Sequence, residues 1–275
     1  MDDGDWTRTP RRGGPLSPLR TYVEIADRER AFGRGERRKA FEAVRLGGGR
    51  AGARVLDLGA GQAWQLRWLA ADYRPVGVEP SSGLVAVGRA RLAADGLAGR
   101  VPLLVGGPGG VPVPEGLADA AIGLNAPLGY GDPADDARSL EAVAASLAPG
   151  ARLVLELASR PLAERRGASR RTRRFPDGAL VDARVRYDPA RGAVAERQEL
   201  RLDGELLGAF AYELRTFDPD GLEELLAAAG LVLDGVHGGT DGCAWRGDRP
   251  LVVVARRPQR VAIVALGGSA HEPAA

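Results

Sequence analysis

Short apolar segments, separated by amphipathic ones, run through the first half of the chain. The apolar segments are brief and nearly continuous, which is typical of strands buried on both faces of a parallel sheet. They fall at residues 55–58, 76–78, 101–105, 120–124 and 153–157. Before the last of them, apolar residues recur at helical spacing at Leu140, Val143, Ala144 and Leu147. Because strands and helices alternate, the pattern predicts a doubly wound α/β sheet.

The pattern changes after residue 158. Residues 159–176 are rich in arginine and show no apolar period. Apolar and polar residues then alternate at 180–187 and again at 206–214, with the turn sequence DPARG after the first run. Runs of period two joined by turn residues predict antiparallel strands. We therefore expect residues 159–216 to form a β-rich insertion, which serves as a lid over the substrate.

The α/β pattern resumes after the insertion. Asp218 suits a helix N-cap, Pro219 the first helical position and Gly230 the C-terminal stop. Two more apolar segments, at 231–236 and 251–255, complete a mostly parallel, seven-stranded sheet. The predicted organisation is a disordered tail at 1–18, an N-terminal helix and α/β core at 19–158, the insertion at 159–216, the end of the core at 217–257 and a tail at 258–275. Within that tail, residues 261–266 form either one more strand or a loosely attached segment.

Composition narrows the classes of function. The chain of 275 residues is 44% hydrophobic and carries a formal net charge of +2, which does not demand a nucleic-acid or membrane partner. One cysteine and two histidines argue against a disulfide or a zinc site, so we expect no metal. The N-terminus lacks a secretory signal, and no apolar run reaches the ~18 residues of a membrane span. We therefore expect a cytoplasmic protein; the oligomeric state stays open.

The first predicted strand runs into a glycine-rich turn, VLDLGAGQAW, at residues 55–64. A phosphate-binding loop needs Gly-Lys-Ser/Thr at its end, whereas Gln-Ala follows Gly61. A dinucleotide fingerprint needs a small residue at position 64, where Trp64 stands. The remaining pattern is acidic-x-Gly-x-Gly, formed by Asp57, Gly59 and Gly61.

This pattern resembles the first motif of the class I S-adenosylmethionine-dependent methyltransferases. Glu79 ends the second predicted strand, where a carboxylate accepts hydrogen bonds from both ribose hydroxyls in that family. The segment LAPGARLVLEL at 147–157 is similar to the family's fifth-strand region, and 212–242 resembles small-molecule methyltransferases with a β insertion. The resemblance covers residues 19–257 and implies S-adenosylmethionine as the cofactor.

By the same resemblance, the cofactor-binding residues are Asp57, Gly59, Ala60, Gly61, Glu79, Gly107, Asn125 and Tyr22. One of these positions departs from the family pattern. An aspartate usually follows the third strand and binds the adenine amino group, but Gly107 stands there. Losing such a bond costs about 1–3 kcal/mol, or up to about a hundredfold in affinity.

The resemblance implies transfer of a methyl group to an oxygen or nitrogen of a small molecule. His237 and Tyr130 are the candidate bases or acceptor contacts, and the candidate substrate-binding residues are Arg174, Arg215 and Asp241. Two alternatives stay open. The arginine run SRRTRRF at 169–175 would suit an RNA or protein methyltransferase, and Gly107 would suit a non-catalytic accessory protein with weakened cofactor binding.

Overall fold

The computed structural model describes residues 16–32, 35–107 and 110–259. Most of the predicted tail at 1–18, and the segment at 261–266, lie outside these residues. Within the described ranges, no helix is long and apolar enough to cross a membrane.

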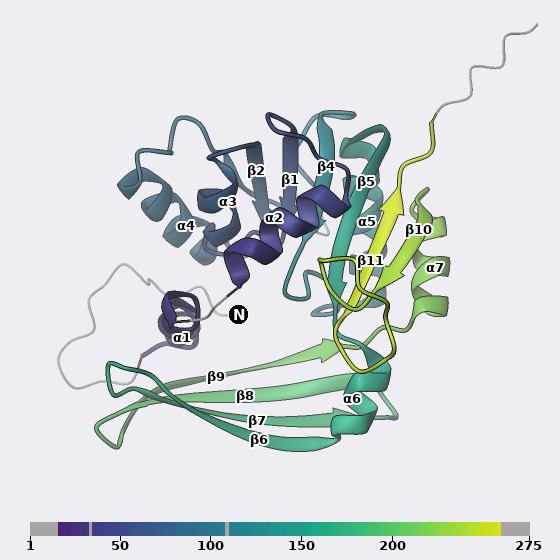
Figure 1. Cartoon of the computed structure of the whole chain (residues 1–275). Helices are drawn as coiled ribbons and strands as arrows, with labels where there is room; N and C mark the ends of the chain where they lie inside the picture. Colours follow the sequence, from purple (N-terminus) through teal and green to yellow (C-terminus); the bar gives the residue numbers. More distant parts are fainter. Residues whose placement is uncertain (1–15, 33–34, 108–109, 260–275) are drawn as a thin grey trace, which may run out of the picture.

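A seven-stranded sheet forms the centre of the molecule (Figure 1). Its strands are β1 (Arg54–Leu58), β2 (Arg74–Glu79), β3 (Leu103–Val105), β4 (Ala118–Gly123), β5 (Leu147–Leu157), β10 (Val232–His237) and β11 (Leu251–Arg256). The order across the sheet is β10-β11-β5-β4-β1-β2-β3, and β11 alone runs antiparallel to its neighbours. The predicted seven-stranded, mostly parallel sheet is therefore confirmed.

Helices cover both faces of this sheet. They are α2 (Glu36–Leu46), α3 (Trp64–Leu69), α4 (Ser82–Ala94), α5 (Pro133–Ser146) and α7 (Pro219–Ala228). Successive residues of one strand face opposite clusters: Leu153 and Leu155 lie with residues of α5 and α7, whereas Val154 lies with residues of α2. Burial on both faces explains why the strands read as continuous apolar runs.

Local signals placed one helix correctly and another wrongly. The Asp218 side chain caps α7 by accepting a hydrogen bond from the Gly221 N–H at 2.9 Å, as predicted. The predicted single N-terminal helix is instead two, α1 (Pro18–Phe32) and α2. Gly35 has a φ of 107°, in the left-handed region, so the chain changes direction immediately before α2.

An antiparallel sheet of four strands forms the insertion and lies beneath the central sheet in Figure 1. Its strands are β6 (Ala168–Arg174), β7 (Leu180–Asp188), β8 (Ala193–Leu202) and β9 (Glu205–Arg215), after the short helix α6 (Arg160–Arg166). The antiparallel insertion is confirmed. The sequence pattern gave no sign of α6 or β6, because β6 carries arginines on both faces and is mostly exposed.

The inner face of this sheet packs on α1. The Tyr22 ring of α1 meets the Phe210 ring of β9 edge to face, with 5.4 Å between centroids. Ile25 packs in the same apolar cluster as Phe210 and Leu200. On the other side of α1, Asp27 forms an ion pair of 2.6 Å with Arg91 of α4. Helix α1 therefore connects the insertion to the central domain.

A second connection lies at the end of β9. The Arg215 guanidinium forms an ion pair with Asp136 of α5 and donates a hydrogen bond to the Gly131 carbonyl. Asp136 is only 5% exposed and also accepts a hydrogen bond from the Gly129 N–H at 3.0 Å. Removing one partner of such a pair leaves an uncompensated buried group.

We therefore expect Asp136→Ala to lower the free energy of unfolding by about 2–4 kcal/mol, since it strands both the Arg215 guanidinium and the Gly129 N–H. Urea denaturation measures this. Glu141→Ala, at an exposed position of the same helix, is the control and should change the stability by less than about 0.5 kcal/mol. Equal stabilities of the two variants would contradict the proposed connection.

Candidate functional site

The carboxyl ends of β1, β2 and β4 meet at one edge of the central sheet. After β1 the chain continues to β2 on one side, and it later returns to β4 on the other side of β1. Such a reversal in strand order leaves a crevice, which is where α/β sheets bind ligands. The glycine-rich turn follows β1 directly into this crevice.

The turn depends on left-handed backbone. Gly59 and Gly61 have φ values of 70° and 53°, and Ala63, which caps α3, has a φ of 66°. A Cβ atom at Gly61 would meet no protein atom within 4 Å. Glycine is therefore needed at position 61 for its backbone angle, and the open space beside it leaves room for a ligand to approach the main chain.

Glu79, at the end of β2, holds this turn in place. One carboxylate oxygen accepts a hydrogen bond from the Gly61 N–H at 3.0 Å, and the other accepts from the Ser81 N–H at 2.9 Å. Glu79 is 7% exposed, and burial raises its pKa, while the two backbone hydrogen bonds oppose that shift. The second strand and the glycine turn are thereby fixed against each other.

Asp57 lies beside Glu79 and is 1% exposed. Burial, with a further contribution from the Glu79 charge, raises the pKa of Asp57 to about 8; Arg30 opposes the shift. The Asp57 Oδ2 atom is buried and has no hydrogen-bond partner in the described structure. Buried polar atoms are rarely left unpaired. This oxygen therefore marks a position where a bound group with hydrogen-bond donors would fit.

Helix α1 brings two polar residues to the same place. Tyr22 and Arg30 both interact electrostatically with this carboxylate pair, and burial raises the pKa of Tyr22. The Nε atom of Arg30 is buried without a partner among the described residues. Tyr22 was predicted here, whereas Arg30 was missed, because nothing in the sequence distinguishes it from the other arginines of the chain.

Tyr130 lies between this edge and the antiparallel sheet. Its ring is 54% exposed and lies 5.8 Å from the ring of Tyr212 on β9. Electrostatic interactions connect Tyr130 with Glu79 of the central sheet and also with Glu196 of β8. The structure thus brings Tyr130 together with the predicted cofactor residues and with two residues that the sequence analysis missed.

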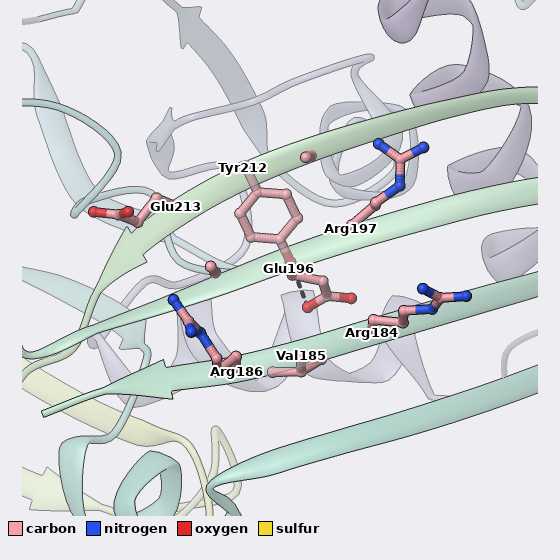
Figure 2. A pocket seen from close by; sticks show the side chains of 9 residues that line it. Arg184, Val185, Arg186, Glu196, Arg197, Tyr212 and Glu213 are labelled. Atoms are coloured by element: carbon pink, nitrogen blue, oxygen red, sulfur yellow. Dashed lines mark hydrogen bonds between the residues drawn. The ribbon is translucent and has the colours of Figure 1, made fainter.

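Those two residues form a hydrogen-bonded pair. The Tyr212 hydroxyl donates to the Glu196 carboxylate at 2.8 Å (Figure 2). Burial and the Glu196 charge both raise the pKa of Tyr212, so its hydroxyl stays protonated. A hollow of about 400 Å³ lies on the opposite face of these strands, where the exposed Arg184, Arg186 and Arg197 alternate with Val185 and Glu196.

Two predicted cofactor residues follow β4 and β3, the strands on either side of β1 and β2. Asn125 follows β4, where its side chain accepts a hydrogen bond from Lys39 at 2.8 Å and its backbone N–H donates to Glu156 at 2.9 Å. Gly107 follows β3, and a Cβ atom there would lie 3.0 Å from the Cβ of Pro80. An aspartate at position 107 would therefore require Pro80 to move.

His237 and Asp241 lie elsewhere. His237 ends β10, which is separated from β1 by β11, β5 and β4, and its Nδ1 atom lies 3.2 Å from the Gly242 carbonyl oxygen. Asp241 is exposed and accepts a hydrogen bond from the Cys243 N–H at 3.1 Å. Across this many strands, at roughly 4.8 Å each, His237 does not meet Asp57 or Glu79.

Arg174 and Arg215, the two arginines predicted to bind substrate, lie in different parts of the structure. Arg174 is exposed at the end of β6. Arg215 is engaged by Asp136 and the Gly131 carbonyl, so in this structure its guanidinium connects the insertion to the central domain.

Comparisons with known proteins agree with this geometry. Residues 55–150 match the family model described as a methyltransferase domain. No curated protein matches the chain.

Solved structures share the fold across nearly the whole chain. The CcbJ methyltransferase from Streptomyces caelestis has a TM-score of 0.69 at 21% identity, covering 92% of this chain and 94% of its own. An S-adenosylmethionine-dependent methyltransferase from Clostridium acetobutylicum scores 0.71 at 14% identity, covering 86% and 99%. CalS10, an amino pentose methyltransferase from Micromonospora echinaspora, scores 0.62 at 22% identity, covering 90% and 99%.

The family match contains the glycine turn and Glu79, and the shared fold includes the antiparallel insertion. The chain therefore carries a methyltransferase domain at residues 55–150 and shares the overall fold of S-adenosylmethionine-dependent methyltransferases of known structure.

Proposed function

We propose that the protein transfers the methyl group of S-adenosylmethionine to an oxygen or nitrogen of a small-molecule acceptor, held between the glycine turn and the antiparallel sheet. The main support is that the Gly59–Gly61 turn, Glu79 and the unpaired Asp57 oxygen lie together at one edge of the central sheet. The methyltransferases of known structure described above share the fold around this edge, which supports its assignment as the cofactor site.

The residues present fit the cofactor. The open main chain at Gly61 suits the close approach of a ligand, and the Glu79 carboxylate keeps acceptor capacity beyond its two backbone hydrogen bonds, which suits a ribose diol. The unpaired Asp57 Oδ2 suits the donors of an ammonium group, and the buried Arg30 Nε atom suits a carboxylate. At Gly107 no side chain reaches the ligand, so we assign any adenine contact there to the backbone.

When bound, S-adenosylmethionine supplies an activated methyl group on a sulfonium centre. The chain's own residues contribute position and shielding. The turn and Glu79 fix one side of the crevice, whereas Tyr22 and Tyr130 bring aromatic surface to it from α1 and from the end of β4. Holding the reacting atoms in line is worth up to about 7–11 kcal/mol, and closure by the sheet excludes water.

The ion pairs made by the arginine run at 169–175 favour a small acceptor over RNA. Arg170, Arg171 and Arg173 form ion pairs with Asp182, Glu196 and Glu29 respectively. Neighbouring residues of β6 point to opposite faces of the sheet, so these cations do not form one continuous basic surface. CalS10 is described as acting on an amino pentose, which supports a small polar acceptor here. A cytoplasmic location stays a prediction.

Glu79 provides the first test. Glu79→Gln replaces one acceptor oxygen with an NH₂ group, so it cannot accept from both Gly61 and Ser81 and still bind the ribose. We expect the affinity for S-adenosylhomocysteine to fall about 10–100-fold, measured by isothermal titration calorimetry. Glu205→Gln, at an exposed position of the insertion, is the matched control. Unchanged affinity in Glu79→Gln would refute the assignment.

Asp57 provides a test by pH. Its pKa in the folded state is raised to about 8, so the folded protein binds a proton that the unfolded chain releases. Stability therefore falls as the pH rises from about 4 towards about 8. Asp57→Asn should flatten this slope in the ligand-free protein, measured by urea denaturation across that range. Glu79 contributes in the same direction, so part of the slope remains. A slope identical to that of the unmodified protein would show that Asp57 is not protonated.

A further inference from the structure

We infer that Glu196, together with Gln198 and Tyr212, binds the amino group of the methyl acceptor, so that the acceptor atom is an amine nitrogen. This inference rests on the proposed function and narrows it. The three residues lie on the inner face of the antiparallel sheet, apart from the site residues that the sequence predicts.

Glu196 is a buried carboxylate with an unusual position. It is 8% exposed, although it stands in the middle of β8 with no helix terminus to stabilise its charge. Tyr212 and Gln198 each donate a hydrogen bond to it at 2.8 Å, and Arg171 reaches it at 3.4 Å. Burying a charged group is costly unless it is well paired, so a position like this usually serves a purpose.

Gln198 adds an unsatisfied acceptor. Its Nε2 group donates to Glu196, which directs the amide, while its Oε1 atom is buried without a partner among the described residues. The strand register places Gln198 opposite Phe210 and Glu196 opposite Tyr212, so the four side chains share one face. The Gln198 carbonyl oxygen therefore stands beside the Glu196 carboxylate as a buried acceptor that no described residue satisfies.

This pair faces the cofactor edge through Tyr130. The Tyr130 ring lies 5.8 Å from Tyr212, and Tyr130 interacts electrostatically with Glu196 and with Glu79. Tyr130 thus lies near both the Glu196 group and Glu79. A small molecule bound against Tyr130 reaches both.

The hydrogen-bonding capacity and charge of Glu196 and Gln198 favour an amine over a hydroxyl. An amino group carries two or three N–H donors, enough for Glu196 and Gln198 together, whereas a hydroxyl group carries one. Aromatic rings at Tyr130 and Tyr212 favour a cation further. A neutral hydroxyl satisfies Gln198 Oε1 but brings no positive charge to the buried Glu196 carboxylate.

The proton balance is complete with these residues. Glu196 accepts a proton from the bound ammonium, which frees the nitrogen lone pair. A nitrogen–carbon bond to the methyl group then forms as the carbon–sulfur bond breaks, with its electron pair passing to sulfur. The product leaves as the methylated ammonium ion, and the protonated Glu196 then returns its one proton to water.

The test uses the full chain and matched probes. Glucosamine with glucose, and phenethylamine with 2-phenylethanol, are pairs that differ mainly in the amino group. Binding to the protein saturated with S-adenosylhomocysteine is measured by calorimetry, and transfer of a labelled methyl group is measured with S-adenosylmethionine across pH. The variants are Glu196→Gln, Gln198→Met and the control Glu199→Gln, which lies on the same strand and pairs with Arg201 and Arg197.

We expect an amine, and not its hydroxyl partner, to bind and to be methylated. Glu196→Gln should weaken amine binding about 10–100-fold and shift the pH profile of kcat/KM upwards, Gln198→Met should weaken binding, and the control should do neither. All three should bind S-adenosylhomocysteine normally. Preference for a hydroxyl, unchanged amine binding in Glu196→Gln, or no amine bound by a protein that binds S-adenosylhomocysteine would overturn this inference alone. Failure to bind S-adenosylhomocysteine would overturn the proposed function as well.

Discussion

The geometry of the cofactor edge depends on the buried Glu79 carboxylate. Its two hydrogen bonds, from the Gly61 and Ser81 N–H groups, fix the glycine turn against the end of β2. They also place a negative charge beside Asp57, and together with burial this raises the pKa of Asp57. One Asp57 oxygen is thus left buried and unpaired, at a position where a ligand that supplies donors would fit.

The antiparallel sheet completes the site without contributing to the central fold. It is connected through α1, which packs on the sheet and pairs with Arg91, and through Arg215, which pairs with Asp136. These connections hold the inner face of the sheet towards the cofactor edge. With the cofactor at the rigid edge and the acceptor on the separate sheet, as we propose, one common fold can serve different acceptors.

Much of the fold and part of the site follow from the sequence, because burial on both faces and glycine turns leave strong local patterns. The strands, the α7 cap and the group of Asp57 with Glu79 were predicted in this way. Strands β6 and β8 were not, because charged residues interrupt any apolar period in both. Glu196 and Arg30 were missed for a different reason: their partners are distant in sequence, and their neighbours do not differ from those of surface residues. His237 is the opposite case, a residue that was expected at the site and lies away from it. The sequence indicates that His237 ends a strand, but it does not reveal how many strands separate that strand from the site.

The central claim is that this sheet edge binds S-adenosylmethionine through the buried carboxylate pair. Titration of the unmodified protein with S-adenosylhomocysteine at pH 7, in buffers of different ionisation enthalpy, tests it most directly. The account predicts saturable one-to-one binding accompanied by release of a proton from Asp57, whose pKa of about 8 keeps it protonated beforehand. No binding at millimolar S-adenosylhomocysteine, or binding without proton release, would contradict it.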